Sequence, residues 1–553
     1  MKKYLILVIF TFTMLGAFLR LYGLNNNPIG LNVDEVSIGY NAYSILKTGR
    51  DEYDKPYPLT FKSLGDFKPP VYIYLTVPSI ALFGLNEFSV RFPSAILATL
   101  AIPFFYLFLL KFVKDKKYAL VGTILLAISP WHLFFSRLAS ETSVATTLTL
   151  VGVFCLLKLF KGGWIWFVTA AIFLVLPMYT YHSERLFIPI FVLLFLLLNR
   201  KKLYHQKNKL IIFILLFFVL LIPLGLSLIL GQDSTRLQMT LISNDINFTR
   251  YISLSSGTPL SGLYGMITNF FGGGGFLLFF HWIRKYLAYF QPSFLFYNGL
   301  DMTATGTYGL GVMYLFEIPF LVMGIYTLFT KEIENKQLII VWLLLGILPA
   351  SLTLSERQPF RSMVILPMLV LVSAIGAVEL FKQVLKMTTF FKARIIFSLF
   401  SIFIIFNLIQ AFLIFTIHFP NQRGEYFMEG NKEAVKYILE NKDKYKEIVF
   451  DPNRGTDGPF VVTVPHLYIL FYSKYEPLIY QHDTKREGGE AFGFDKYTIR
   501  QVNWIEDGDK ADTLFIATPW HIPEKELKTG EILQKVYLSN GNLAYLIVSP
   551  KPN

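Results

Sequence analysis

Long apolar segments separated by short polar ones run through the first three quarters of this 553-residue chain. A membrane span needs roughly 20 mostly apolar residues, with some latitude. About eleven segments follow this pattern: 4–22, 94–112, 118–135, 142–160, 163–180, 186–198, 210–230, 310–330, 337–354, 361–382 and 394–417. The pattern therefore predicts an α-helical polytopic membrane protein, and a composition of 54% hydrophobic and 16% charged residues agrees with it.

Basic residues indicate the orientation of these spans. The net charge of +13 does not point to nucleic acid, because Lys and Arg cluster in short loops between apolar segments. With the N-terminus in the cytoplasm, the basic loops 111–117, 199–209 and 381–394 all lie inside. The apolar segment 71–85 is then interpreted as a helix along the outer interface, since one more span would move later basic loops outside. We expect a multi-pass protein of the plasma or inner membrane.

Two domains follow from the same pattern. Residues 1–418 form the predicted transmembrane domain, with a first outer loop at 23–93 and a long outer loop at 231–309. Residues 419–553 are less apolar and contain an amphipathic helix, a following strand and two later strands bounded by turn residues. This tail is predicted to be a soluble extracytoplasmic α/β domain.

Adjacent carboxylates open a helical pattern in the first outer loop. Asp34 and Glu35 precede apolar residues spaced by four, three and three from Val36 to Leu46, and Gly49 marks the expected helix end. The apolar face is expected to rest on the membrane surface. Acids at a helix start commonly serve as caps, while outward-facing acids can also act in catalysis. The helix pattern alone leaves both roles open.

Several motifs resemble those of one enzyme superfamily. "DE" at 34–35, "KPP" at 68–70 and "GLNEFSVRFPSA" at 84–95 resemble the first loop of the GT-C glycosyltransferases, most of all the protein O-mannosyltransferase and aminoarabinose-transferase branch. The segments at 127–141 and 348–367 resemble later family loops. The likeness covers most of residues 1–385 and depends on order and spacing more than on any single motif.

This resemblance implies an enzyme that transfers a sugar from a polyprenyl-phosphate carrier to a lipid, glycan or protein acceptor outside the membrane. It implies Asp34 as general base and Glu35 as the residue that orients Arg91 or the substrate. It also implies donor-phosphate contacts from Lys68, Arg91, Arg137 and Arg361, and substrate contacts from the long-loop residues Tyr289, Tyr297 and Asp301. No cofactor is required, although Asp66 and His281 could hold a divalent metal as acids and histidines do in some relatives.

Two other classes of protein remain open. A flippase or transporter of lipid-linked saccharides would need polar residues deep within several spans, whereas here they gather at the outer ends. A ligase or polymerase of lipid-linked saccharides would share the outward arginines without needing the early acid pair. The single cysteine, Cys155, excludes an intramolecular disulfide. The sugar and the acceptor are not identified by the sequence.

Overall fold

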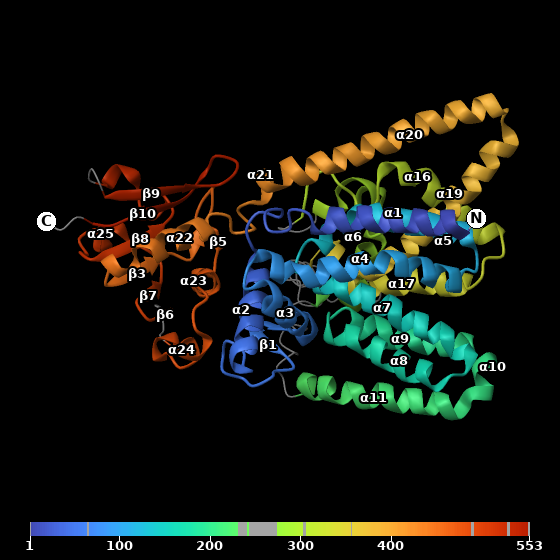
Figure 1. Cartoon of the computed structure of the whole chain (residues 1–553), viewed down its shortest axis with the longest axis horizontal. Coiled ribbons are helices and arrows are strands. Elements are labelled where there is room, and N and C mark those ends of the chain that lie inside the picture. The colour runs from blue at the N-terminus through green and yellow to red at the C-terminus, as the bar shows by residue number, and fades with distance from the viewer. Residues whose placement is uncertain are drawn as a thin grey trace, which may run out of the picture.

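The computed structural model describes residues 2–63, 66–229, 241–242, 274–301, 306–355, 357–487, 492–527 and 531–550. Figure 1 shows two parts, a long helical bundle and a smaller α/β domain attached at one end of it. The helix α1 (Lys2–Leu21), near the start of the chain, and the helix α20 (Phe390–Leu413), near the end of the bundle, run along the same side of it (Figure 1). Most of the predicted long outer loop lies outside the described residues.

Helices make up the bundle, and each of the eleven predicted spans falls on one or more of them. Their bounds are α1 (Lys2–Leu21), α4 (Glu87–Phe112), α5 (Lys116–Ile128), α6 (Pro130–Ser136), α7 (Glu141–Lys158), α8 (Trp164–Val175), α9 (Glu184–Leu198), α10 (Arg200–Leu203), α11 (Lys207–Ile229), α15 (Gly274–Ala288), α16 (Ile318–Thr330), α17 (Lys336–Ser351), α18 (Pro359–Ser362), α19 (Leu366–Met387), α20 (Phe390–Leu413) and α21 (Phe419–Arg423).

Length and composition qualify part of this set as membrane spans. Among the described residues, six helices are long and apolar enough to cross a membrane, or seven if the bent pair α5 and α6 is one span. Shorter apolar helices add to the bundle at Pro70–Phe83, Trp164–Tyr179, Leu315–Thr330 and Lys336–Ser351. The chain is a polytopic membrane protein, and the number of eleven spans stays a prediction.

Local sequence explains where these helices break and how closely they pack. A bend of 50° separates α5 from α6. It occurs where Pro130 begins the new helix and the Ser129 side chain caps it. Glycines allow α16 and α19 to meet closely, because a Cβ on Gly376 would lie 1.8 Å from the Phe320 carbonyl oxygen. Small residues at such crossings are typical of membrane helices.

The first outer loop forms a compact layer at one end of the bundle. It contains α2 (Val33–Thr48), the hairpin strands β1 (Phe61–Ser63) and β2 (Asp66–Lys68), and α3 (Pro70–Phe83). The prediction that α2 ends at Gly49 is confirmed, since this residue adopts a left-handed C-cap conformation with φ of 70°. Its expected position on the membrane surface is wrong. The Tyr40 side chain of α2 is fully buried and donates to the Tyr475 carbonyl of the soluble domain.

A six-stranded sheet forms the centre of the C-terminal domain, with strand order β6-β7-β3-β8-β10-β9. Strand β3 is parallel to β7 and β8, and the other neighbours are antiparallel. The predicted amphipathic helix and the three predicted strands correspond to α22, β3, β8 and β10. The bounds are α22 (Asn431–Asn441), β3 (Glu447–Phe450), β4 (Asn453–Arg454), β5 (Val461–Val462), α23 (Pro465–Ser473), α24 (Pro477–Gln481), β6 (Phe492–Phe494), β7 (Tyr497–Ile499), α25 (Trp504–Asp507), β8 (Thr513–Ala517), β9 (Ile532–Tyr537) and β10 (Leu543–Val548).

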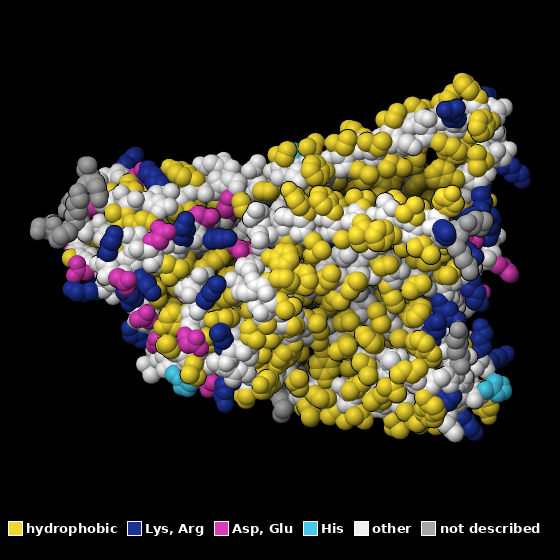
Figure 2. All heavy atoms as spheres, viewed as in Figure 1, with side chains coloured by type: hydrophobic (Ala, Val, Ile, Leu, Met, Phe, Trp, Pro, Cys, Tyr) yellow, Lys and Arg dark blue, Asp and Glu magenta, His cyan; other side chains and the backbone are white. Residues whose placement is uncertain are grey.

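Surface charge differs between the two ends of the molecule. In Figure 2 a broad hydrophobic band covers the middle of the bundle, and Lys and Arg gather at the end away from the α/β domain. The domain itself carries side chains of both signs (Figure 2). Basic residues are enriched on the cytoplasmic side of membrane proteins. This distribution agrees with the orientation that the sequence predicts.

A cluster of charged residues around Asp507 in the soluble domain is expected to make the stability of the fold depend on pH. The Asp507 carboxylate accepts hydrogen bonds from Arg500, Lys510 and the Asn503 amide. Burial alone would raise the pKa of Asp507, but these donors lower it from 3.8 to about 2. The ionised carboxylate therefore stabilises the fold above about pH 4, and this contribution is lost as the pH falls toward 2.

We expect Asp507→Asn to lower the free energy of unfolding at pH 7 by about 2 kcal/mol, because one pKa unit corresponds to about 1.4 kcal/mol. Thermal unfolding of the detergent-solubilised protein would measure the effect. The difference from wild type should shrink between pH 4 and pH 2. Asp509→Asn, which changes an exposed neighbour, is the matched control. Equal unfolding temperatures for the two variants at pH 7 would contradict the assignment.

Candidate active site

The N-terminus of α2 gives the two adjacent carboxylates different surroundings. Glu35 completes a capping box, in which its amide donates to the Asn32 side chain at 2.9 Å and its carboxylate accepts from the Asn32 amide at 3.2 Å. Asp34 precedes it in the same helical turn, yet its side chain is 76% exposed. The capping role therefore explains Glu35 and does not explain Asp34.

A buried ion pair anchors this helix start to the bundle. The Arg91 guanidinium on α4 donates from Nε and Nη2 to the two Glu35 oxygens, each at 2.9 Å. Neither side chain is more than 1% exposed. Glu35 also accepts from the Ala139 amide at 3.0 Å, which ties it to the turn before α7. Bidentate pairs of this kind fix orientation as well as adding energy.

The remaining Arg91 protons hold the loop that precedes α2. They are donated to the carbonyl oxygens of Leu24, Pro28 and Gly30. The sequence predicts a phosphate contact for Arg91, but in the structure its guanidinium is buried and donates entirely within the protein. Its geometry is that of a positioning residue.

Arg137 has a similar arrangement at the end of α6. Its guanidinium donates to the carbonyl oxygens of Leu19, Tyr22, Gly23 and Asn27. Only 5% of Arg137 is exposed. Its predicted phosphate contact is therefore also replaced by contacts to main chain, here those of the turn after α1.

Asp34 and Lys68 meet at the outer surface of this layer. The Lys68 ammonium lies 3.0 Å from the Asp34 carboxylate and also donates to the Asp34 carbonyl at 3.3 Å. Only 8% of the Lys68 side chain is exposed, because it emerges from β2 directly before the two prolines that begin α3. The structure thus places an exposed carboxylate beside a cation that is almost fully buried.

Arg361, the predicted arginine of the late loop, follows a residue that contacts the first turn of α7. Thr142, in the first turn of α7, donates to the carbonyl of Phe360, the neighbour of Arg361, at 2.7 Å. Arg361 stacks over the Phe360 ring, and its buried Nη1 has no hydrogen-bond partner among the described residues. Gln358, in the same loop, donates its amide to the Tyr289 hydroxyl, and burial raises the pKa of that phenol.

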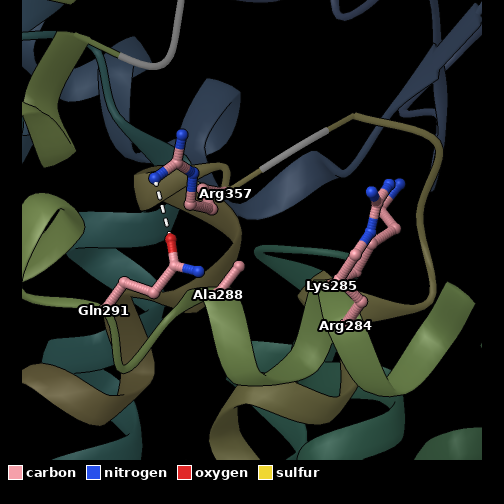
Figure 3. Close-up of a pocket in the computed structure, with 5 residues that line it drawn as sticks. All are labelled: Arg284, Lys285, Ala288, Gln291 and Arg357. Carbon is pink, nitrogen blue, oxygen red and sulfur yellow. Dashed lines mark hydrogen bonds between the residues drawn. The ribbon is translucent and has the colours of Figure 1, made fainter. Parts of the chain in front are cut away.

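Three further cations, which the sequence analysis missed, surround a small cavity nearby. Figure 3 shows Arg284 and Lys285 rising from α15 toward the same side as Arg357 from the loop before α18. The cavity has a volume of about 170 Å³, and Arg357 donates to Gln291 at 3.3 Å on its wall. A signal was present, because adjacent basic residues in an outer segment depart from the positive-inside pattern.

The other predicted residues have different surroundings. Asp301 pairs with Arg423 of α21 at 2.6 Å, which connects the long loop to the base of the soluble domain. Tyr297 is 66% exposed. The backbone of Asp66 lies in β2, while its side chain is outside the described part. His281 lies in α15. No group of three His, Cys, Asp or Glu residues in the described ranges could hold a metal ion, and a divalent metal stays a prediction.

Comparisons with known proteins agree with the fold. The family model of dolichyl-phosphate-mannose-protein mannosyltransferases matches residues 67–225. No curated protein matches the chain. The crystal structure of ArnT from Cupriavidus metallidurans bound to undecaprenyl phosphate is similar with a TM-score of 0.52 and 10% identity, over 98% of this chain and 97% of that one. The oligosaccharyltransferase AglB from Archaeoglobus fulgidus, in complex with an inhibitory peptide and a dolichol-phosphate, gives 0.46 and 14% identity, over 80% and 58%.

Proposed function

We propose that this chain, a PMT/ArnT-like protein with the GT-C fold, is a membrane glycosyltransferase that uses a polyprenyl-phosphate sugar as donor. The acceptor is a hydroxyl group on the extracytoplasmic side of the membrane. The observation that carries the proposal is the exposed Asp34 carboxylate, set beside Lys68 on a helix start that the buried Glu35–Arg91 pair holds in place.

In the proposed reaction, an acceptor hydroxyl attacks the anomeric carbon of the donor sugar. The bond from that carbon to the phosphate oxygen breaks, and polyprenyl phosphate leaves with the bonding electrons. The Asp34 carboxylate takes the hydroxyl proton as the new glycosidic bond forms. Its negative charge also stabilises an oxocarbenium-like transition state.

The proposal includes a single displacement with inversion, in which Glu35 is not a nucleophile. Retaining enzymes need a second carboxylate as nucleophile beside the acid–base group. Glu35 cannot serve in this way, because its oxygens accept from Arg91, Asn32 and Ala139 and it is 1% exposed. We therefore expect the anomeric configuration of the product to be opposite to that of the donor, which NMR of the product would establish.

Cations at the same face can neutralise the leaving phosphate. Lys68 is held beside Asp34, and Arg361 presents a nitrogen that has no partner among the described residues. The cavity lined by Arg284, Lys285 and Arg357 adds positive charge in the predicted outer region. Fixed cations stabilise developing negative charge most strongly where water is excluded. Arg91 and Arg137 act in this proposal as positioning residues. No step is assigned to a metal.

We also propose an orientation of the protein in the membrane. We place the N-terminus in the cytoplasm and both Asp34 and the α/β domain outside, in the plasma or inner membrane. The basic end of the bundle in Figure 2 supports this arrangement. A flippase is less well supported, because the exposed Asp34 carboxylate and its partner Lys68 lie together in the layer at one end of the bundle.

Lys68→Ala tests the donor site. A hydrogen bond to a charged group contributes about 1.5–3 kcal/mol. We therefore expect kcat/KM for a polyprenyl-phosphate sugar to fall roughly 10- to 100-fold, with weaker binding of the donor measured by equilibrium titration in nanodiscs.

Lys62→Ala is the matched control, because Lys62 lies on the partner strand of the same hairpin and is exposed. It should leave both quantities near their wild-type values. Unchanged donor binding in Lys68→Ala would remove Lys68 from the phosphate site. A loss of equal size in the two lysine variants would point to general surface charge instead.

A further inference from the structure

The central strands of the soluble domain are arranged as in a doubly wound α/β sheet. Strand β3 lies between β7 and β8 and is parallel to both. The chain passes from β3 through α23 to β7, and then through α25 to β8 on the other side of β3. These connections cover opposite faces of the sheet, because Leu470 of α23 shares an apolar cluster with Ile448, and Trp504 of α25 shares another with Val449. In such sheets, ligands bind beyond the carboxyl ends of the two strands where the connections diverge, which are here β3 and β8.

The Asp451 carboxylate joins three loops at this point. Asp451 directly follows β3, and its oxygens accept from the Asn453 amide and from the Val502 amide beyond β7, each at 2.8 Å. His521, beyond β8, lies with its Nδ1 2.7 Å from the same carboxylate. A carboxylate can only accept, so this Nδ1 carries a proton. The Asp451 side chain is fully buried, and it therefore fixes the position of the His521 ring.

His521 in turn contacts a polar side chain at the surface. Its Nε2 lies 3.2 Å from the amide nitrogen of Gln501, which is an exposed residue of the loop after β7. This contact uses one of the two amide protons of Gln501, and its other proton and its carbonyl oxygen can bond to a ligand. The Thr518 hydroxyl, at the carboxyl end of β8, is buried and has no hydrogen-bond partner among the described residues. Polar groups that both donate and accept thus gather at this edge.

An exposed indole ring lies next to these polar groups. Trp520 precedes His521 and is 52% exposed. Its Nε1 donates at 2.9 Å to the carbonyl of Gly455, in the loop after β3 that begins with Asp451. The Trp520 and His521 side chains therefore both contact this loop. Because the indole is held by its polar edge, its apolar face can pack against a ligand.

A phosphate or nucleotide fits this edge less well than an uncharged ligand does. Doubly wound sheets bind phosphate through free backbone amides in the turn after the first strand. Here that turn begins with the Asp451 carboxylate and with Pro452, which has no amide proton, and the Asn453 amide is already donated to Asp451. The Arg500 guanidinium, beyond β7, donates to the Asp507 carboxylate with both terminal nitrogens.

We propose that this edge of the soluble domain binds a neutral saccharide. Trp520 packs against the C–H face of a sugar ring, and Gln501 exchanges hydrogen bonds with its hydroxyl groups. Asp451 and His521 are positioning residues, which hold the loops and the Gln501 amide. The inference goes beyond the proposed function, because it adds a saccharide site outside the layer that contains Asp34.

The loop after β3 also connects this edge with the first outer loop. Arg454, next to Gly455, donates to the Glu429 carbonyl at 2.9 Å. Glu429 and Gly30 line a cavity of about 260 Å³ between the soluble domain and the turn before α2. The proposed saccharide site therefore lies on a loop that contacts the wall of this cavity, so that a bound saccharide is held on the soluble domain close to the first outer loop.

Titration of the full-length protein in nanodiscs tests the inference. The probes are maltotetraose, mannotetraose and chitotetraose, and saturation-transfer NMR measures their dissociation constants. We expect at least one probe to bind, Trp520→Ala to weaken its binding about tenfold or more, and Gln501→Ala to weaken it roughly 2- to 10-fold. Absence of binding by all three probes, or equal binding in wild type and Trp520→Ala, would overturn the inference.

Tyr537→Ala is the matched control for the tryptophan variant. Tyr537 is also an exposed aromatic residue of the soluble domain, at 55%, but it lies on β9, which β10 separates from β8. Both variants change exposed side chains, so both should keep the unfolding temperature of wild type. Tyr537→Ala should also keep the dissociation constant of wild type, and equal losses in the two variants would overturn the inference.

Two further measurements identify the source of the saccharide and separate this site from the reaction site. Displacement of the best probe by a lipid-anchored copy in the same nanodisc would support a glycolipid head as ligand, and no displacement would support a free glycan. Asp34→Asn should bind the probe as wild type does, and lost binding in this variant would overturn the inference. Binding that depends on Trp520 in a protein without transfer activity would support this site and count against the proposed function.

Discussion

Asp34→Asn is expected to lower kcat by roughly 10²- to 10⁴-fold, the usual contribution of a general base. The amide keeps the size of the side chain but cannot accept the hydroxyl proton. Because Asp34 is 76% exposed and Glu35 makes the capping contacts, the variant should fold like wild type. Single-turnover transfer with saturating donor, together with donor titration, would separate lost chemistry from lost binding.

Asp54→Asn is the matched control for this substitution. Asp54 is also an exposed acid of the first outer loop beside a basic partner, Arg50, at 3.2 Å. It should retain activity close to that of wild type. Equal activity of Asp34→Asn and Asp54→Asn would assign the proton to another group, whereas weaker donor binding in Asp34→Asn would assign Asp34 to the donor site.

Arg91→Ala is expected to cause the largest loss of stability in the chain's outer layer. It leaves the buried Glu35 carboxylate without its partner and frees three loop carbonyls. Breaking a buried pair in this way costs about 3–5 kcal/mol. We expect a lower thermal unfolding temperature in detergent and poor recovery of monodisperse protein.

Two further variants determine the origin of this loss. Glu35→Gln combined with Arg91→Met removes both charges and should recover part of the stability. Arg50→Ala breaks an exposed pair, which is worth at most about 1 kcal/mol, and should unfold close to wild type. If Arg91→Ala destabilises no more than Arg50→Ala does, the buried pair does not anchor α2.

Local patterns predicted the helices well for a physical reason. A helix satisfies its own backbone hydrogen bonds, as the bilayer requires, so long apolar segments indicate helices even where a proline bends them. The end of α2 could be predicted because Gly49 takes a left-handed conformation that other residues adopt at a cost. The strands β3, β8 and β10 were likewise visible as short apolar segments between turn residues.

Contacts between distant segments could not be predicted in this way. Tyr40, on the apolar face of α2, contacts Tyr475 and Tyr480, more than 400 residues later in the chain. The sequence of α2 alone therefore could not predict that the soluble domain buries this face. The partners of Arg91 and Arg137 are main-chain carbonyls, which every residue possesses. Their predicted phosphate contacts were therefore reasonable from residue type, although the geometry favours positioning.

The most direct test of the central claim uses a doubly labelled donor, a polyprenyl phosphate with ³²P in the phosphate and ¹⁴C in the sugar. A panel of such donors would be incubated with the full-length protein in proteoliposomes and with extracted cell-envelope acceptors. We predict that ¹⁴C moves to acceptor while ³²P remains as polyprenyl monophosphate, in equal amounts. Movement of intact, doubly labelled donor across the membrane without cleavage would contradict the account and would favour a flippase.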